Sequence, residues 1–215
     1  NDYLNVLGQT LAIFSERPEI FGGYHFQILD SDEINAFATP SGLVFVTRGI
    51  LRLAASEDSV AAILAHEIGH IVKKHGLQSI KQSRITEALT STAITAVEMS
   101  DNEELEKLTD TFSESITDIT KTVIVNGYSR DFELQADRMA VEILVKAGYN
   151  PQTLIGLLEA LDRSYKPGGV DFAKTHPNPA KRIDSAKKAI RNVRFSDEGP
   201  VPARERRFAA FMSRI

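Results

Sequence analysis

The chain has 215 residues, a formal net charge of −4 at pH 7 and no cysteine. The absence of cysteine excludes disulfide scaffolds, cysteine nucleophiles, iron–sulfur clusters and cysteine-ligated zinc sites. The slight acidic excess disfavours a dedicated nucleic-acid binder, because such domains usually carry a basic surplus. A single domain of this length can bury a sizeable hydrophobic core, and we expect residues 1–215 to form one domain.

No segment of the sequence is suited to cross a membrane as a helix. The longest stretch without a charged residue or histidine is Ile34–Thr47, and Pro40 and Gly42 interrupt it. A spanning helix needs about 20 apolar residues, so we expect no transmembrane segment. The first residue is Asn rather than Met, so we expect any leader to have been removed already, and its absence carries no information about the compartment.

The pattern of apolar residues predicts a mainly helical α+β fold with a small sheet near the N-terminal end. Helices are indicated by 3.6-residue periodicity and polar caps, and strands by alternation between turns rich in Gly, Pro and Asp. The first expected elements are a helix over 3–15 and strands over 24–29, 35–39 and 43–47. A helix follows Ser56 and ends near 73–76 or runs on, and helical arms over 77–125 are broken near Asp101. Further helices are expected over about 129–147, over 151–161 and from 178, and a basic amphipathic stretch over 203–215. The second and third strands are expected to form a hairpin-like pair.

The most informative segment reads His66-Glu67-Ile68-Gly69-His70. Successive helix residues are about 100° apart, so the two histidines lie about 40° apart on one face and can bind one Zn²⁺. Glu67 points to the side, where it can act as general base on a metal-bound water. Apolar residues on the opposite side would give this helix a separate face to bury. The alternative is a surface helix with incidental histidines, although such a motif arises by chance in roughly one of a hundred chains of this composition.

Two histidines leave a catalytic zinc one protein ligand short, and without cysteine the third must be His, Glu or Asp. Glu133 and Asp137 are the best candidates, because they lie four residues apart on a predicted helix with apolar neighbours. We expect Glu133 to be the ligand and Asp137 to accept a hydrogen bond from the far nitrogen of a ligand histidine. The alternative is an exposed helix face on which Arg130 and Arg138 are their neighbours.

Two further histidines need an interpretation. His176 precedes a predicted helix in a proline-rich loop, where it could hydrogen-bond a tetrahedral oxyanion or occupy the open zinc position, although a lone loop histidine is usually a surface residue. Arg182, in the helix that follows, could anchor the loop or pair with a carboxylate. His75 is nine positions from His66, about 180° away on a continuous helix, so we expect a structural or capping role and not a metal ligand.

In their order, these motifs resemble the zinc metallopeptidases grouped with the HtpX heat-shock protease and the CAAX prenyl protease, and most of all the soluble, single-domain bacterial members. The resemblance covers residues 26 to 183, within a motif-bearing core of about 26–190 that a basic tail over 191–215 follows. It is carried by the stretches 34–40 and 44–51, the His66–His70 motif with His75 after it, the Glu133 and Asp137 pair, and the segment 175–183.

The resemblance implies a gluzincin-type metallopeptidase fold, with helices around a small sheet whose edge strand borders the active-site cleft. By resemblance, the zinc ligands are His66, His70 and Glu133, the base is Glu67, Asp137 and Arg182 support the ligands, and His176 lies near the reaction centre. The edge-strand residues beside the cleft, to which an extended substrate can add as a strand, are Asn35, Ala36, Phe37 and Ala38.

The membrane members of this family carry spanning helices, whereas the longest uncharged piece of 77–125 is Ala88–Val97, ten residues long. The resemblance therefore points to the branch that includes periplasmic proteases of outer-membrane assembly, and away from prenylated substrates. The leading interpretation is a zinc metalloendopeptidase with one Zn²⁺ that cleaves unfolded or misassembled proteins in a bacterial periplasm or cell envelope, with envelope assembly partners and no nucleic acid.

The alternative is a zinc-stabilised chaperone or assembly factor, or a latent protease in which His176 blocks the open zinc position. The lack of a glycine-rich phosphate loop and of a nucleophile-elbow pattern argues against dinucleotide enzymes and serine hydrolases. Because thiolates are absent, the metal site must be built from nitrogen and oxygen ligands, which is typical of a catalytic rather than a structural zinc site.

Overall fold

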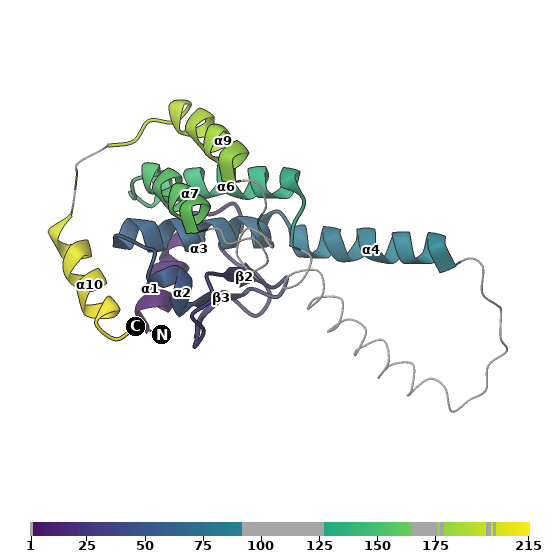
Figure 1. Cartoon of the computed structure of the whole chain (residues 1–215), viewed down its shortest axis with the longest axis horizontal. Helices are drawn as coiled ribbons and strands as arrows, with labels where there is room; N and C mark the ends of the chain where they lie inside the picture. Colours follow the sequence, from purple (N-terminus) through teal and green to yellow (C-terminus); the bar gives the residue numbers. More distant parts are fainter. Residues whose placement is uncertain (1, 92–126, 165–175, 177–178, 197–198, 200) are drawn as a thin grey trace.

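The computed structural model of the chain describes residues 2–91, 127–164, 176, 179–196, 199 and 201–215, and over 84–91 it describes the backbone alone. Helices surround one small sheet (Figure 1), so the predicted mainly helical α+β class is confirmed. The elements are α1 (Asp2–Ile13), β1 (His25–Leu29), β2 (Ala36–Ala38), β3 (Leu43–Thr47), α2 (Arg48–Leu51), α3 (Glu57–Val72), α4 (His75–Ser91), α6 (Arg130–Lys146), α7 (Gln152–Ser164), α9 (Pro179–Arg191) and α10 (Pro202–Met212). The helical arm and the break expected between 92 and 125 lie outside the described residues.

The sheet has the strand order β1-β3-β2, with β3 parallel to β1 and antiparallel to β2. The expected hairpin therefore joins β2 to β3, and its turn places Gly42 at φ +97°, a conformation that side chains rarely adopt. Strand β2 lies at the edge of the sheet. The backbone of Asn35 and Thr39 bonds to β3, so Ala36 and Ala38 direct their carbonyls toward the open side.

The four-residue helix α2 is absent from the expected elements. It follows β3 without a loop, because the side chain of Thr47 caps its first turn by accepting a hydrogen bond from the N–H of Ile50. The same hydroxyl donates to backbone carbonyls before β2. Thr47 therefore ties the start of α2 to the sheet.

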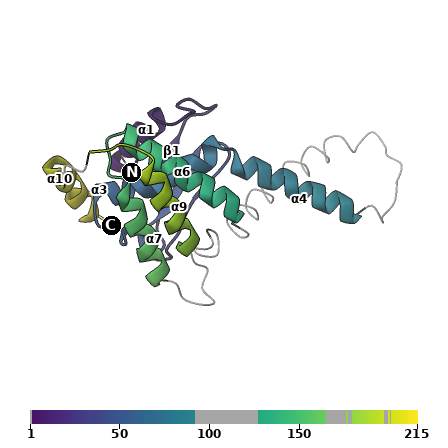
Figure 2. The ribbon, with the colours of Figure 1, turned by 90° about the horizontal axis from the view of Figure 1, so that it is seen from above.

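Helix α3 is the central element of the fold. Its N-cap is Ser56, as expected, and the helix lies between the sheet and α6 and α7 (Figures 1 and 2). The sequence predicted one buried face, and the structure buries every α3 residue except Asp58. Gly69 allows the close packing, since a Cβ there would lie 3.0 Å from the backbone oxygen of Ala136 on α6.

Helix α3 ends at Val72, and Lys74 adopts φ +58° before α4 begins at His75. The chain changes direction there, and α4 projects away from the other helices (Figure 1). The expected position of His75 on the opposite side of a continuous helix is therefore wrong, because its placement follows the turn and not the periodicity of α3.

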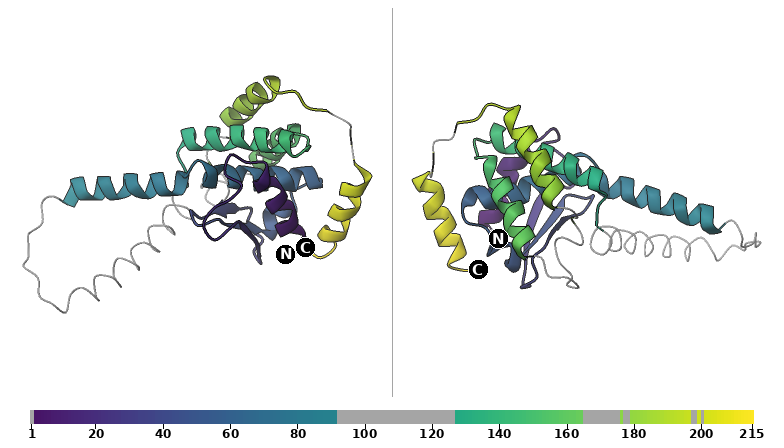
Figure 3. Two further views of the ribbon diagram at one scale, coloured as in Figure 1. Left: turned by 180° about the vertical axis from the view of Figure 1, so that it is seen from behind. Right: turned by 45° about the horizontal axis from the view of Figure 1, so that its top comes forward.

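The last helix, α10, packs against the N-terminal end of α3, and the two ends of the chain lie close together (Figure 3). The ring of Tyr3 stacks on Phe211 with centroids 4.3 Å apart. Arg207 forms an ion pair with the buried carboxylate of Glu57, which also accepts hydrogen bonds from Tyr3 and Tyr149. Among the described residues, no helix is both long enough and apolar enough to cross a membrane.

Candidate metal centre

Four buried side chains direct their potential ligand atoms toward one point. The Nε2 atoms of His66 and His70 are 3.1 Å apart, and the carboxylate oxygens of Glu133 lie 3.3 Å from the Nε2 of His70 and 3.5 Å from that of His66. With a nitrogen of His176, these ligand atoms all lie within 4.8 Å of one another. The structure thus brings the three expected ligands together, and His176 joins them.

The two histidines come from α3 and Glu133 from α6, and the close contact at Gly69 brings these two helices together. Ser129 caps α6 by accepting from the N–H of Phe132, so Glu133 lies in the first turn. Glu133 and Asp137 are completely buried on the side of α6 that faces α3. The exposed-face alternative for these carboxylates is therefore wrong.

Asp137 and Arg182 support the cluster from outside. The Nδ1 of His66 lies 2.9 Å from Asp137, so the carboxylate can accept from that nitrogen while Nε2 faces the cluster. Arg182 donates two hydrogen bonds of 2.7 and 2.8 Å to Asp137, and it lies 2.9 Å from Glu133. Burial raises the pKa of Asp137, but the paired guanidinium outweighs it and lowers that pKa below its ordinary value.

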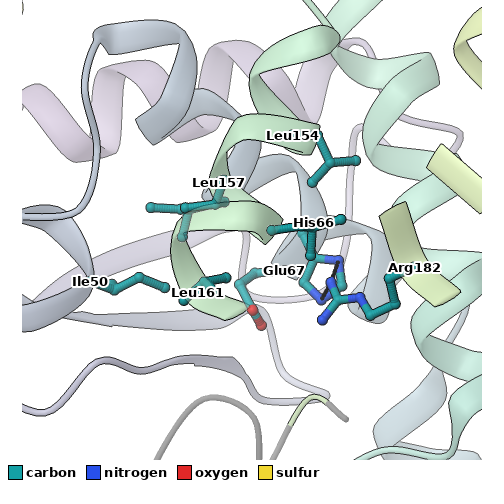
Figure 4. Close-up of a pocket in the computed structure, with 9 residues that line it drawn as sticks. Ile50, His66, Glu67, Leu154, Leu157, Leu161 and Arg182 are labelled. Carbon is teal, nitrogen blue, oxygen red and sulfur yellow. Dashed lines mark hydrogen bonds between the residues drawn. The ribbon is translucent and has the colours of Figure 1, made fainter. Parts of the chain in front are cut away.

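Glu67 lies beside these converging side chains. It is fully buried, and its two carboxylate oxygens accept no hydrogen bond from the described residues. The Nε2 of His176 lies 3.9 Å from one of these oxygens. Leucines of α7 and Ile50 line the pocket next to it (Figure 4), and burial raises its pKa. A desolvated carboxylate of raised pKa next to a metal-binding site can serve as a general base.

His176 connects the cluster to the edge strand. Its Nε2 donates to the carbonyl of Ala36 at 3.1 Å, which leaves Nδ1 directed at the cluster, 3.1 Å from both oxygens of Glu133. The hydroxyl of Tyr128 donates to the carbonyl of Ala38 at 3.5 Å. The expected substrate strand therefore lies beside the cluster, but the two carbonyls on its open side already have side-chain partners.

Two site residues were not recognised in the sequence. Tyr128 stacks its ring on His70 with centroids 4.1 Å apart, and no local sequence signal distinguishes it. His75 lies with its Nδ1 3.0 Å from the Nδ1 of His70, and its ring stacks on Phe132. Burial lowers the pKa of His75 to about 4, so the ring is neutral at pH 7. The Lys73-Lys74-His75-Gly76 run, which suggests a helix end, was the one signal that could have placed it correctly.

The donor set fits a metal ion with nitrogen and oxygen ligands. Two imidazoles present Nε2 to the same point, a carboxylate completes the set, and the chain offers no thiolate. Burial holds the pKa of His70 well below its ordinary value, so this ring is neutral and can coordinate. Burial and Arg182 oppose protonation of His66, but hydrogen bonds to Asp137 and Glu133 outweigh them and raise its pKa to about 9. A metal ion would displace that proton.

A helix that carries two histidines and a glutamate, completed by a carboxylate from a second helix, defines a metallopeptidase domain. The chain belongs to peptidase family M48, whose family model matches residues 1–190. The predicted resemblance and the predicted peptide hydrolase class are thereby confirmed.

The chain is also similar to several curated proteins. The beta-barrel assembly-enhancing protease of Escherichia coli K12 is 27% identical over 198 residues, which are 89% of this chain and 39% of that protein. The mitochondrial metalloendopeptidase OMA1 of Schizosaccharomyces pombe is 31% identical over 151 residues, 69% of this chain and 41% of that protein. OMA1 of Arabidopsis thaliana is 28% identical over 162 residues, 74% of this chain and 30% of that protein. The chain thus matches less than half the length of each.

Proposed function

We propose that this chain is a zinc-dependent endopeptidase in which His66, His70 and Glu133 hold one Zn²⁺. The observation that carries the proposal is the convergence of these three ligand atoms beside the buried carboxylate of Glu67, which accepts no hydrogen bond from the described residues. Zinc, when bound, supplies a Lewis acid that acidifies water and polarises a peptide carbonyl. The imidazole-rich donor set favours zinc over magnesium and calcium, which prefer oxygen ligands.

Glu67 is the proposed general base. It takes a proton from the attacking water and delivers it to the amine that leaves the cleaved peptide bond. Burial beside the leucines raises the pKa of Glu67, so the carboxylate accepts a proton more readily near neutral pH. Asp137 fixes the orientation of His66, and Arg182 neutralises the buried carboxylates of Asp137 and Glu133.

The proposed substrate is an extended protein chain that pairs with β2 through the carbonyls of Ala36 and Ala38. Strand addition requires an extended segment, so unfolded or misassembled proteins fit better than compact folded ones. The bacterial relatives are named as proteases that enhance beta-barrel assembly, and this favours envelope proteins as substrates or partners and a periplasmic location. We further propose that residues 1–215 act as one peptidase domain.

A latent form of the same enzyme is the second candidate. His176 directs Nδ1 into the ligand cluster and its other nitrogen to Ala36, so one side chain covers both the metal position and the substrate strand. In either form, a substrate that adds to β2 must displace the side chains of His176 and Tyr128 from the carbonyls of Ala36 and Ala38. Cleavage by the His176→Ala variant separates the candidates: a large gain favours latency, a loss favours a role for His176 in the reaction, and no cleavage by any form favours a chaperone.

The proposal is tested with purified protein and an unfolded substrate such as casein. We expect one zinc ion per chain, loss of cleavage on chelation and its return with added zinc. The Glu133→Ala variant is expected to lose both tight zinc binding and cleavage, whereas Glu142→Ala, on an exposed turn of the same helix, is the matched control. Tight zinc binding by Glu133→Ala would show that the third ligand is misassigned.

A further inference from the structure

The two proposed ligand histidines of α3 have different partners at the ring nitrogen that faces away from the cluster. For His66, Nε2 faces the cluster and Nδ1 faces the carboxylate of Asp137. For His70, Nε2 again faces the cluster, and Nδ1 faces the Nδ1 of His75 at 3.0 Å. A metal-bound histidine needs its other nitrogen held by a partner, which fixes the tautomer and the angle of the ring.

We infer that His75 is the positioning residue for His70, in the place that Asp137 takes for His66. When His70 coordinates through Nε2, its proton resides on Nδ1, so it donates and the Nδ1 of His75 must accept. His75 then carries its own proton on Nε2, which lies 3.5 Å from the amide oxygen of Gln135. A chain of hydrogen bonds from His70 through His75 thus ends on α6.

The surroundings of His75 keep its ring in place for this role. Its side chain is completely buried, and the ring stacks on Phe132 with centroids 4.3 Å apart and planes 9° apart. The turn at Lys74 directs the ring of His75 toward His70 on α3. Phe132 and Gln135 flank Glu133 on α6, so one helix supplies a metal ligand and orients a second one through His75.

Two variants separate hydrogen bonding from packing. His75→Phe keeps a ring against Phe132 and removes the acceptor, whereas His75→Asn keeps an acceptor near the position of Nδ1 and removes the ring. We expect His75→Phe to weaken zinc binding by about 10–100-fold and His75→Asn to stay within a few-fold of wild type. Zinc affinity is measured by competition with a chromogenic chelator, with His25→Phe, on an exposed strand position, as control.

The inference is overturned if His75→Phe binds zinc as tightly as wild type, or if His75→Asn loses as much affinity as His75→Phe. Long-range ¹H–¹⁵N NMR of the zinc-loaded wild type gives a readout that needs no variant: the proton is expected on Nε2 of His75, and a proton on Nδ1 contradicts the role. The inference rests on the proposed function, and the two fail differently, because a wild type without stoichiometric zinc refutes the zinc site itself.

A second and independent feature is a cavity of about 180 Å³ next to the edge strand. Its walls include Ala38 and Thr39 of the β2 end and the metal-site residue His70, so it is continuous with the proposed substrate path. Two cations, Arg17 and Lys74, also line it. Their chain neighbours Glu16 and Lys73 pair with each other, and within the described residues no carboxylate pairs with Arg17 or Lys74.

We propose that this cavity binds a carboxylate of the substrate chain, a few residues from the bond that is cut. Its volume suits one side chain, and two cations with no acidic partner among the described residues complement a negative charge. This proposal also depends on the proposed peptidase function. The carboxylate can come from an acidic side chain within the substrate or from its C-terminus, and the peptides below distinguish the two.

The test uses fluorogenic peptides in which Glu, Gln or Lys is placed in turn at each position around the cut. We expect wild type to favour Glu at one position by about tenfold in kcat/KM, mainly through KM. The Arg17→Glu/Lys74→Glu double variant should reverse that preference toward Lys, while Arg48→Glu, outside the cavity, should not. Preference only for peptides that end there as free acids, and not as amides, assigns the site to the C-terminus. Cleavage without a charge preference, or a preference that the double variant retains, refutes the proposal.

Discussion

Arg182 is expected to stabilise the folded protein in the absence of zinc, because it pairs with two buried carboxylates. The side chain is 2% exposed and pairs with Asp137 and Glu133, which are both fully buried. Removing one partner of a buried ion pair typically costs about 3–5 kcal/mol, because the remaining charge stays buried without compensation. Arg182→Met leaves two such carboxylates, so we expect the zinc-free protein to lose about 5 kcal/mol, the upper end of that range.

Zinc should reduce this loss, since a bound cation compensates Glu133 and leaves only Asp137 without its partner. We therefore expect a smaller effect of Arg182→Met, about 3 kcal/mol, when zinc is present. The assay is urea unfolding followed by circular dichroism, with chelator and with excess zinc. Arg48→Met is the control, because its pair with Asp30 is exposed and should contribute at most about 1 kcal/mol. The reasoning is refuted if Arg182→Met destabilises no more than Arg48→Met, or equally with and without zinc.

The acid sensitivity of the zinc-free protein follows from the same contacts. Burial raises the pKa values of Glu133 and Asp137, but His176 and Arg182 outweigh it for Glu133 and Arg182 does so for Asp137, and both pKa values are lowered. A carboxylate with a lowered folded-state pKa stabilises the fold above its unfolded pKa, near 4, and loses that contribution as the pH falls through the folded value. Because Arg182→Met removes this lowering and leaves the carboxylates buried, its loss of stability relative to wild type should be largest at neutral pH and should shrink as the pH falls through about 4 and both carboxylates become protonated, which urea unfolding at a series of pH values measures.

Three further predictions concern zinc affinity and packing. Because the pKa of His66 is about 9 in the metal-free site, the apparent zinc affinity should rise about tenfold per pH unit up to about pH 9, and an affinity independent of pH would contradict the proton displacement. Gly69→Ala should destabilise by about 1–3 kcal/mol in thermal unfolding, because its Cβ would press on the backbone of α6, and an unchanged midpoint would refute the close contact. Arg207→Met should cost about 1–3 kcal/mol, since Glu57 stays buried, and a neutral effect would show that its two tyrosine partners suffice.

Local spacing was sufficient to predict which polar side chains of α3 and α6 converge. The four-residue separations on α3 and α6 place each pair on one helix face in any context, so His66, His70, Glu133 and Asp137 could be assigned from periodicity and residue chemistry. The order of helices and strands also followed from caps and turn residues. Such features depend on neighbours in the chain, which the sequence displays directly.

The remaining features depend on contacts between distant segments. The burial of α3 on all sides results from the packing of α6, α7 and the sheet, which periodicity within α3 does not reveal. The sequence suggested a helix end near 73–76, but the position of the His75 side chain depends on the left-handed conformation of Lys74, which a non-glycine residue does not predict. The pairing of His176 with Ala36 joins residues 140 positions apart.

The central claim is that Glu67 acts as base beside a zinc ion held by two histidines and a glutamate. The most direct measurement is the cleavage rate of an unfolded protein by wild type and Glu67→Gln, each with its zinc content determined. We predict one zinc ion per chain in both proteins, cleavage by wild type and none by the variant. A variant that binds zinc and still cleaves the substrate at the rate of wild type would contradict the account.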